Sequence, residues 1–171
     1  VTESDEPVRH RLIGLGEVLW DCFPDGQRPG GATSNVAFHA TQLDCEGFVV
    51  SRVGDDERGR ELVSYLTRQG LNVDEIQRDR DEPTGRVTVE ITGAGQHEFI
   101  IHEDVAWDRL EFTPSLQQLM ATADAVCFGT LAQRCPASRE TIQRCLFETG
   151  DDCLIVFDVN IRQHFYDRIV I

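Results

Sequence analysis

The chain has 171 residues, and its 30 acidic and 16 basic side chains give a net charge of −14 at pH 7. Every basic residue is an arginine, and the lack of lysine excludes both a P-loop and Schiff-base chemistry. Nucleic acid is excluded as an expected partner because no arginine cluster offsets the acidic balance. No apolar run reaches the ~20 residues of a membrane helix, and residues 1–10 lack a signal-peptide core, so we expect one cytoplasmic domain with no membrane contact.

The first half of the chain predicts strands alternating with amphipathic helices. Thr33 is placed to cap a helix whose apolar face holds Ala37, Ala40 and Leu43. In chain order we expect a buried strand that continues into a second extended piece over 11–20, a Pro- and Gly-rich loop over 22–31, a helix over 33–43, a strand over 48–53 and a helix over 57–69.

The middle of the chain predicts a β-hairpin, which interrupts the alternation of strands and helices. Residues 86–92 alternate apolar and polar side chains, residues 93–95 form a turn, and residues 96–102 return. We expect the hairpin to form a lid, made from about 17–29 and 84–104, in which it pairs with the extended piece near Glu17–Phe23.

The last third returns to the alternating pattern. We expect a helix over 114–121, a strand over 125–129, a helix capped near Ser138 and a strand over 153–158. Short apolar strands between amphipathic helices are typical of a parallel sheet covered on both faces. The predicted fold class is therefore α/β, with a central, mostly parallel sheet over residues 10–171.

Polar residues gather where three predicted segments reach the carboxyl ends of strands, which is where open parallel sheets bind ligands. They are Asp21, the Gly30-Gly31 pair with Asn35, and the alternating polar residues Asp158, Asn160 and Arg162. Carboxylate and amide groups suit a polyhydroxylated, uncharged ligand, and a guanidinium suits a phosphate being transferred. Taken singly, Asp21 also fits a turn and Asn35 a helix cap.

Several other patterns carry no predicted chemistry. Gly14-Leu-Gly16 begins like a dinucleotide fingerprint, but the third glycine is replaced by Leu19. The six cysteines and five histidines have no metal-ligand spacing, so we expect no metal site, and we leave His102 as a contact from lid to ligand. No Gly-x-Ser-x-Gly elbow supports a hydrolase.

An ordered series of motifs resembles the ribokinase-like (PfkB) carbohydrate kinases, and within them the fructokinase branch. The series is Gly14-Leu-Gly-Glu-Val-Leu-Trp-Asp21, Gly30-Gly-Ala-Thr-Ser-Asn-Val-Ala37, Ser51-Arg-Val-Gly-Asp55, Pro83-Thr-Gly85, Phe128-Gly-Thr-Leu131 and Asp158-Val-Asn-Ile-Arg162. The resemblance implies a three-layer sandwich with a β-lid, and transfer of the γ-phosphoryl group of ATP, with Mg²⁺, to a sugar hydroxyl.

The resemblance also assigns expected roles to residues. Sugar binding falls to Asp21, Gly30, Gly31, Asn35, Asn160 and Arg162, with Arg162 also near the phosphate. Lid contacts fall to Thr84, Gly85, Phe99 and His102. The resemblance further allows a homodimer through the lid.

The chain departs from the family in lacking a Gly-x-Gly-Asp segment, which bears the catalytic Asp of the family. We therefore expect the chain to be the amino-terminal half of a sugar kinase, inactive alone, with the general base and the ATP-binding half beyond Ile171. Two alternatives stay open: a non-catalytic sugar-binding or assembly module, and a nucleoside kinase of the same fold.

Overall fold

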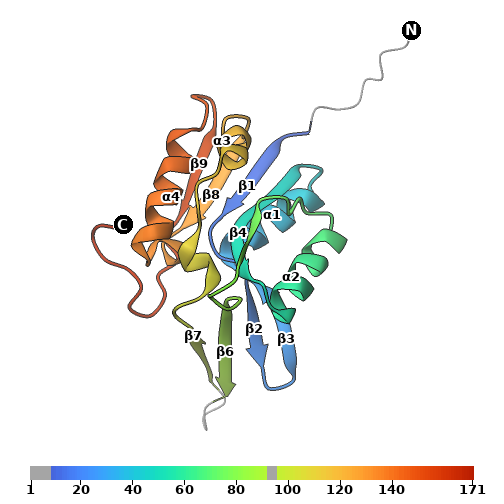
Figure 1. Ribbon diagram of the computed structural model, residues 1–171, viewed down its shortest axis with the longest axis vertical. Helices are drawn as coiled ribbons and strands as arrows, with labels where there is room; N and C mark the ends of the chain where they lie inside the picture. Colours follow the sequence, from blue (N-terminus) through green and yellow to red (C-terminus); the bar gives the residue numbers. More distant parts are fainter. Residues whose placement is uncertain (1–8, 92–95) are drawn as a thin grey trace.

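The computed structural model describes residues 9–91 and 96–171, which form a five-stranded sheet, a smaller four-stranded sheet and the helices around them (Figure 1). The turn expected at 93–95 lies outside these residues. The strands are β1 (Arg11–Leu15), β2 (Leu19–Phe23), β3 (Gly26–Gly30), β4 (Glu46–Gly54), β5 (Ile76–Asp79), β6 (Arg86–Ile91), β7 (His97–Ile101), β8 (Ala125–Gly129) and β9 (Leu154–Asp158). The α-helices are α1 (Ala32–Gln42), α2 (Glu57–Arg68), α3 (Pro114–Met120) and α4 (Pro136–Phe147), and the 3₁₀ helices are η1 (Ala106–Arg109) and η2 (Leu131–Gln133).

The larger sheet has the strand order β5-β4-β1-β8-β9, and every neighbouring pair is parallel. β1 lies in the middle, where Ile13 is opposite Phe48 on β4 and Val126 on β8. Because all five strands run the same way, their carboxyl ends meet at one edge. The expected parallel sheet is confirmed.

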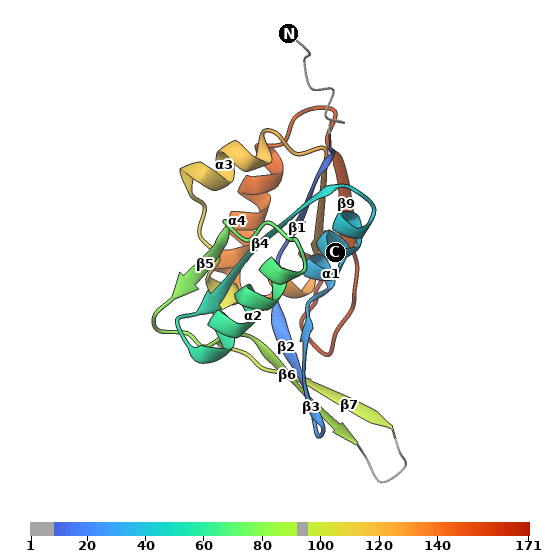
Figure 2. The ribbon, with the colours of Figure 1, turned by 90° about the vertical axis from the view of Figure 1, so that its right-hand side faces the viewer.

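Helices cover both faces of this sheet, which makes three layers (Figures 1 and 2). On one face Val49 packs with Ala37 of α1 and Leu62 of α2. On the other face Ile13 packs in a second cluster that includes Leu116 of α3 and Ile142 of α4. Successive strand residues point to opposite faces, and β4 therefore contributes Phe48 and Val50 to one cluster and Val49 and Val53 to the other. The three-layer α/β arrangement agrees with the expectation from the sequence.

The smaller sheet, β3-β2-β6-β7, projects beyond the carboxyl ends of the central strands (Figures 1 and 2). β6 and β7 form the expected antiparallel hairpin, and β2 pairs in parallel with β6. β2 follows β1 almost directly, so one stretch of chain passes from the core sheet into the smaller one. We refer to the four strands as the lid.

Four local expectations were wrong. The loop expected over 22–31 contains β3, which pairs with β2. The N-cap of α1 is Gly31 rather than Thr33, because the Thr33 hydroxyl donates to the Glu17 carbonyl (3.2 Å) instead. Leu43 follows the end of α1 and is exposed. α4 begins before Ser138, whose buried hydroxyl joins the Trp107 carbonyl (2.7 Å) to the Leu110 amide (2.9 Å).

Candidate functional site beneath the lid

A cavity of about 260 Å³ lies between the lid and the carboxyl ends of the central strands. Its polar wall comes from three separate segments: Asp21 on β2, Asn35 on α1, and Asn160 with Arg162 after β9. Its apolar wall is made of Leu19, Val87, Phe99, Ile101 and Leu131. One cavity therefore brings together a carboxylate, two amides and a guanidinium, as the sequence pattern predicted.

Asp21 and Arg162 carry opposite charges in this cavity. Partial burial raises the pKa of Asp21, and the nearby Arg162 guanidinium opposes that shift. An ionised Asp21 accepts hydrogen bonds only, so it selects hydroxyl or amine donors. Each hydrogen bond to a charged group contributes about 1.5–3 kcal/mol, which is enough to make a missing ligand hydroxyl costly.

The two glycines allow close approach between the lid and α1. Gly31 has a φ of 115°, in the region that favours glycine, and its Cα faces the Glu17 carbonyl. Gly30 does not line the cavity but lies against it, since a Cβ placed there would contact Asp21 Oδ2. Both positions let the backbone pass beside the polar groups of the site.

The segment after β9 is fixed by the core on one side and by the lid on the other. The Thr130 hydroxyl donates to the backbone carbonyl of Asn160 (2.9 Å), and the backbone N–H of Asn160 donates to Asp158 Oδ1 (3.1 Å). Gln163, which follows Arg162, donates from Nε2 to the Phe99 carbonyl of β7 (3.0 Å). The position of Arg162 is therefore tied to that of the lid strand.

Of the four expected lid contacts, only Phe99 lines the cavity. Thr84 is buried below the lid, where its hydroxyl donates to Asp56 Oδ1 (2.6 Å). Gly85 faces the Trp107 ring, and His102 Nε2 shares a hydrogen bond with the Thr88 hydroxyl (2.8 Å). These three residues support the base and the strands of the lid.

Glu17 is a cavity residue that sequence reasoning did not single out. It lies between β1 and β2, and only 2% of it is exposed. Glu17 could have been identified as a candidate site residue because it is the one charged residue in the otherwise apolar run Gly14–Trp20. Phe99 was expected as a lid contact, but Val87, Ile101 and Leu131 gave no such signal, because their side chains look like ordinary core positions.

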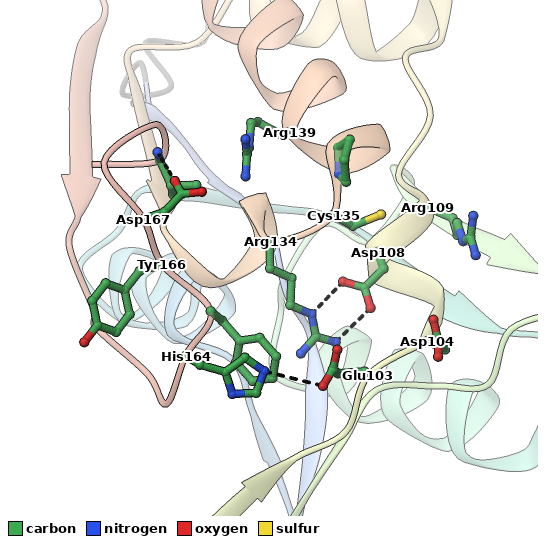
Figure 3. Close-up of a pocket in the computed structure, with 13 residues that line it drawn as sticks. Glu103, Asp104, Asp108, Arg109, Arg134, Cys135, Arg139, His164, Tyr166 and Asp167 are labelled. Carbon is green, nitrogen blue, oxygen red and sulfur yellow. Dashed lines mark hydrogen bonds and ion pairs between the residues drawn. The ribbon is translucent and has the colours of Figure 1, made fainter.

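A second cavity of about 460 Å³ lies beside η1 and the start of α4 (Figure 3). Arg134 Nε and Nη2 each donate to Asp108 at 2.8 Å, and both side chains are only 7% exposed. The guanidinium also stacks on Trp107 and Phe165, at 4.0 and 4.6 Å from the ring centres. Four carboxylates and three arginines line this cavity, so its lining favours neither an anion nor a cation.

Two further observations limit what the described part of the chain offers. Among residues 9–91 and 96–171 no group of three or more His, Cys, Asp or Glu side chains is placed to hold a metal ion. The helices in the same residues are all too short or too polar to cross a bilayer.

Sequence relatives of the chain are sugar kinases by name. An uncharacterized sugar kinase, PH1459, from Pyrococcus horikoshii is 31% identical over 136 residues, which cover 80% of this chain and 44% of that protein. Fructokinase-2 from Solanum habrochaites is 27% identical over 167 residues, covering 88% of this chain and 50% of that protein. The chain thus spans about half the length of the curated relatives it matches.

Solved structures agree with this relationship. The crystal structure of PH1459 has a TM-score of 0.80 at 28% identity, and the match covers 89% of this chain and 53% of that one. Fructokinase from Vibrio cholerae has a TM-score of 0.78 at 21% identity, covering 94% and 57%, and shows the shared fold alone. Because residues 11–170 match the family model described as pfkB family carbohydrate kinase, the chain belongs to that family.

Proposed function

We propose that the cavity beneath the lid binds a sugar, and that the chain supplies the sugar-binding and lid portion of an ATP-dependent sugar kinase. The observation that carries the proposal is the convergence of Asp21, Asn35 and Arg162 from three segments on one cavity. Family membership over residues 11–170 supports the reaction class. The finer assignment to a fructokinase rests on relatives that bear that name.

In this proposal each wall of the cavity has its own task. Asp21 accepts hydrogen bonds from sugar hydroxyls, and Asn35 and Asn160 both donate and accept. Gly31 lets the backbone approach the sugar, and Gly30 leaves room for the Asp21 carboxylate. Phe99 and its apolar neighbours cover the C–H surfaces of the ring and exclude water, which strengthens the polar contacts inside.

In this proposal Arg162, which lines the same cavity, contacts the transferred phosphoryl group, because its fork of donors matches phosphate oxygens. Transfer from ATP also needs a base for the attacking hydroxyl and further stabilisation of the phosphoryl oxygens. The described residues hold no group of three or more His, Cys, Asp or Glu side chains placed for a metal ion, and we derive no step through ATP or the metal from this chain. We propose that these groups come from outside the 171 residues.

Titration calorimetry of the chain with D-fructose and other hexoses tests sugar binding. We expect saturable binding, weakened about 10-fold or more by Asp21→Ala because a charged hydrogen-bond acceptor is lost. Unchanged affinity would remove Asp21 from the site. Circular dichroism of the variant controls for folding.

A coupled assay for ADP formation tests whether the groups needed for phosphoryl transfer lie outside the 171 residues. We expect no sugar-dependent ATP consumption by the 171-residue chain alone, and turnover by pure material would overturn that part of the proposal. A coding sequence that continues past Ile171 into a Gly-x-Gly-Asp segment supports the kinase. A gene without one favours a sugar-binding or assembly module.

Pairing of two copies through the lid belongs to the same proposal. Ile91 and Phe99 on the lid are both exposed, which leaves apolar surface for a second copy. Sedimentation equilibrium of the chain with and without D-fructose tests for such a dimer.

A further inference from the structure

Glu17 holds the start of α1 with one half of its carboxylate. Oε1 accepts a hydrogen bond from the Ala32 amide (2.8 Å), the first backbone N–H of the helix. The Glu17 carbonyl accepts from the Thr33 hydroxyl (3.2 Å). The residue is therefore fixed at the wall of the cavity, beside the helix that carries Asn35.

The other half of the carboxylate has no protein partner. Oε2 is shielded from solvent and makes no hydrogen bond within the described residues. Buried polar atoms in folded proteins are nearly always hydrogen-bonded, so an unpaired carboxylate oxygen on a cavity wall calls for a missing donor. A sugar placed in the cavity brings such donors.

We propose that Glu17 is a further ligand-binding residue of this site, whose Oε2 accepts a hydrogen bond from one hydroxyl of the bound sugar. The inference rests on the proposed function. Glu17 lines the cavity although Oε2 itself is shielded, so the contact requires a turn of the carboxylate about its last torsion, which is broad in glutamate.

The charges around Glu17 make this contact sensitive to pH. Burial raises the pKa of Glu17, and the carboxylate of Asp158 adds to that rise, while backbone N–H groups at Ala32 and Thr33 oppose it. Cys127 on β8 also lies close enough for Glu17 to raise the pKa of its thiol. Asp21 and Arg162 are the other charged groups on the cavity.

The competing explanation is that Glu17 only caps α1, and Glu17→Gln separates the two. The amide oxygen of Gln can still accept from Ala32, which preserves the cap, but the second position becomes an N–H donor. A purely structural role predicts unchanged sugar binding in Glu17→Gln. A direct contact predicts that the sugar hydroxyl loses its acceptor.

The experiment is titration calorimetry with D-fructose and with analogues that each lack one hydroxyl, on the wild-type chain, Glu17→Gln and Glu17→Ala. We expect Glu17→Gln to bind D-fructose about 10-fold to 100-fold more weakly, with a melting temperature close to that of the wild type. One analogue should bind both proteins equally, because its missing hydroxyl is the one that Glu17 holds. Glu17→Ala should lose both binding and stability.

The pH dependence of sugar affinity is a second test, because it would not change if Glu17 only capped α1. Wild-type affinity should fall as the pH drops through the raised pKa of Glu17, and Glu17→Gln should lack that part of the fall while keeping the part due to Asp21. Glu46→Gln is the matched control, because Glu46 pairs with Arg11 at the opposite end of the strands (3.0 Å).

The outcomes separate this inference from the proposed function. If the wild type binds D-fructose and Glu17→Gln binds it and every analogue equally well, the inference is wrong and the proposed function stands. If the wild type binds no hexose, the proposed function fails and the inference falls with it.

Discussion

Gly30 shows how a single missing side chain shapes the site. A Cβ at this position would contact Oδ2 of Asp21 and crowd the Leu19 side chain. The lid strands β2 and β3 pair here, with Leu19 opposite Gly30, so the backbone has little room to retreat. The Asp21 carboxylate keeps its place in the cavity because only hydrogen occupies that side of Gly30.

Gly30→Ala should therefore weaken sugar binding about 10-fold, by moving Asp21, while changing stability by only about 1 kcal/mol. Calorimetry and chemical denaturation measure the two effects. Gly150→Ala is the matched control, since a Cβ at Gly150 meets nothing within 4 Å. Equal sugar affinities for the two variants would show that Asp21 tolerates the added methyl group.

At the scale of elements, Asp56 joins α2 to the base of the lid. Its Oδ1 accepts from the Gly59 amide (2.7 Å) as the N-cap of α2 and from the Thr84 hydroxyl (2.6 Å). Its Oδ2 accepts from the Thr84 amide (2.9 Å), two residues before β6. One carboxylate thus fixes where the hairpin leaves the body of the protein.

Burial alone would raise the pKa of Asp56, but the hydrogen bonds from Thr84 and Gly59, with Arg58 nearby, lower it overall. A lowered folded pKa gives stability that is present above the unfolded pKa and is lost as the pH falls through the folded pKa. We expect Asp56→Asn to lose less unfolding free energy between neutral and acid pH than the wild type does. Urea titrations at both pH values measure this, with Asp151→Asn, at an exposed loop position, as control. Parallel losses would contradict the assignment.

The ion pair of Arg134 with Asp108 links the end of η2 to η1, and Arg134 Nη2 also donates to the carbonyl of His102, which follows β7 (2.7 Å). Arg134→Met leaves a buried carboxylate unpaired and should lower the free energy of unfolding by about 3–5 kcal/mol. Adding Asp108→Leu should restore much of the loss. Arg144→Met is the control, because exposed Arg144 stacks on Phe112 (4.2 Å) and makes no ion pair with another described residue. An equally small loss in both single variants would refute the role of the pair.

The sequence predicted most elements because their apolar spacing was regular, and it failed where another contact decided the outcome. β5, Ile76–Asp79, is short and mostly polar, and it is a strand because it pairs with the edge of β4. Thr33 has the side chain of a cap, but the Glu17 carbonyl takes its hydroxyl. The polar cluster of the site was predictable from strand ends, whereas the apolar wall depended on where the lid folds over.

At the scale of the whole molecule, the sheet ends in an unprotected edge. β9 is the last strand, and Leu154, Ile155 and Val156 are 63%, 42% and 42% exposed. An apolar edge strand offers unpaired backbone groups to other chains. The same strand leads directly into Asn160 and Arg162, so the edge and the site share one segment.

We expect the 171-residue chain to associate as its concentration rises, and Ile155→Lys to reduce that association by placing a charge on the edge. Sedimentation velocity over a range of concentrations measures this. Leu43→Lys is the control, since Leu43 is 76% exposed but follows a helix instead of lying on an edge strand. An equal effect of both variants would point to general surface hydrophobicity.

The two tryptophans give this molecule its own optical probe. Trp20 precedes Asp21 on β2 and donates from its indole nitrogen to the Arg58 carbonyl (3.0 Å), while Trp107 lies under the guanidinium of Arg134. One indole is therefore part of the lid and the other is near its base. Binding of a ligand at Asp21 should change the fluorescence of Trp20. The variant Trp107→Phe removes the other tryptophan, so that the change can be assigned to Trp20.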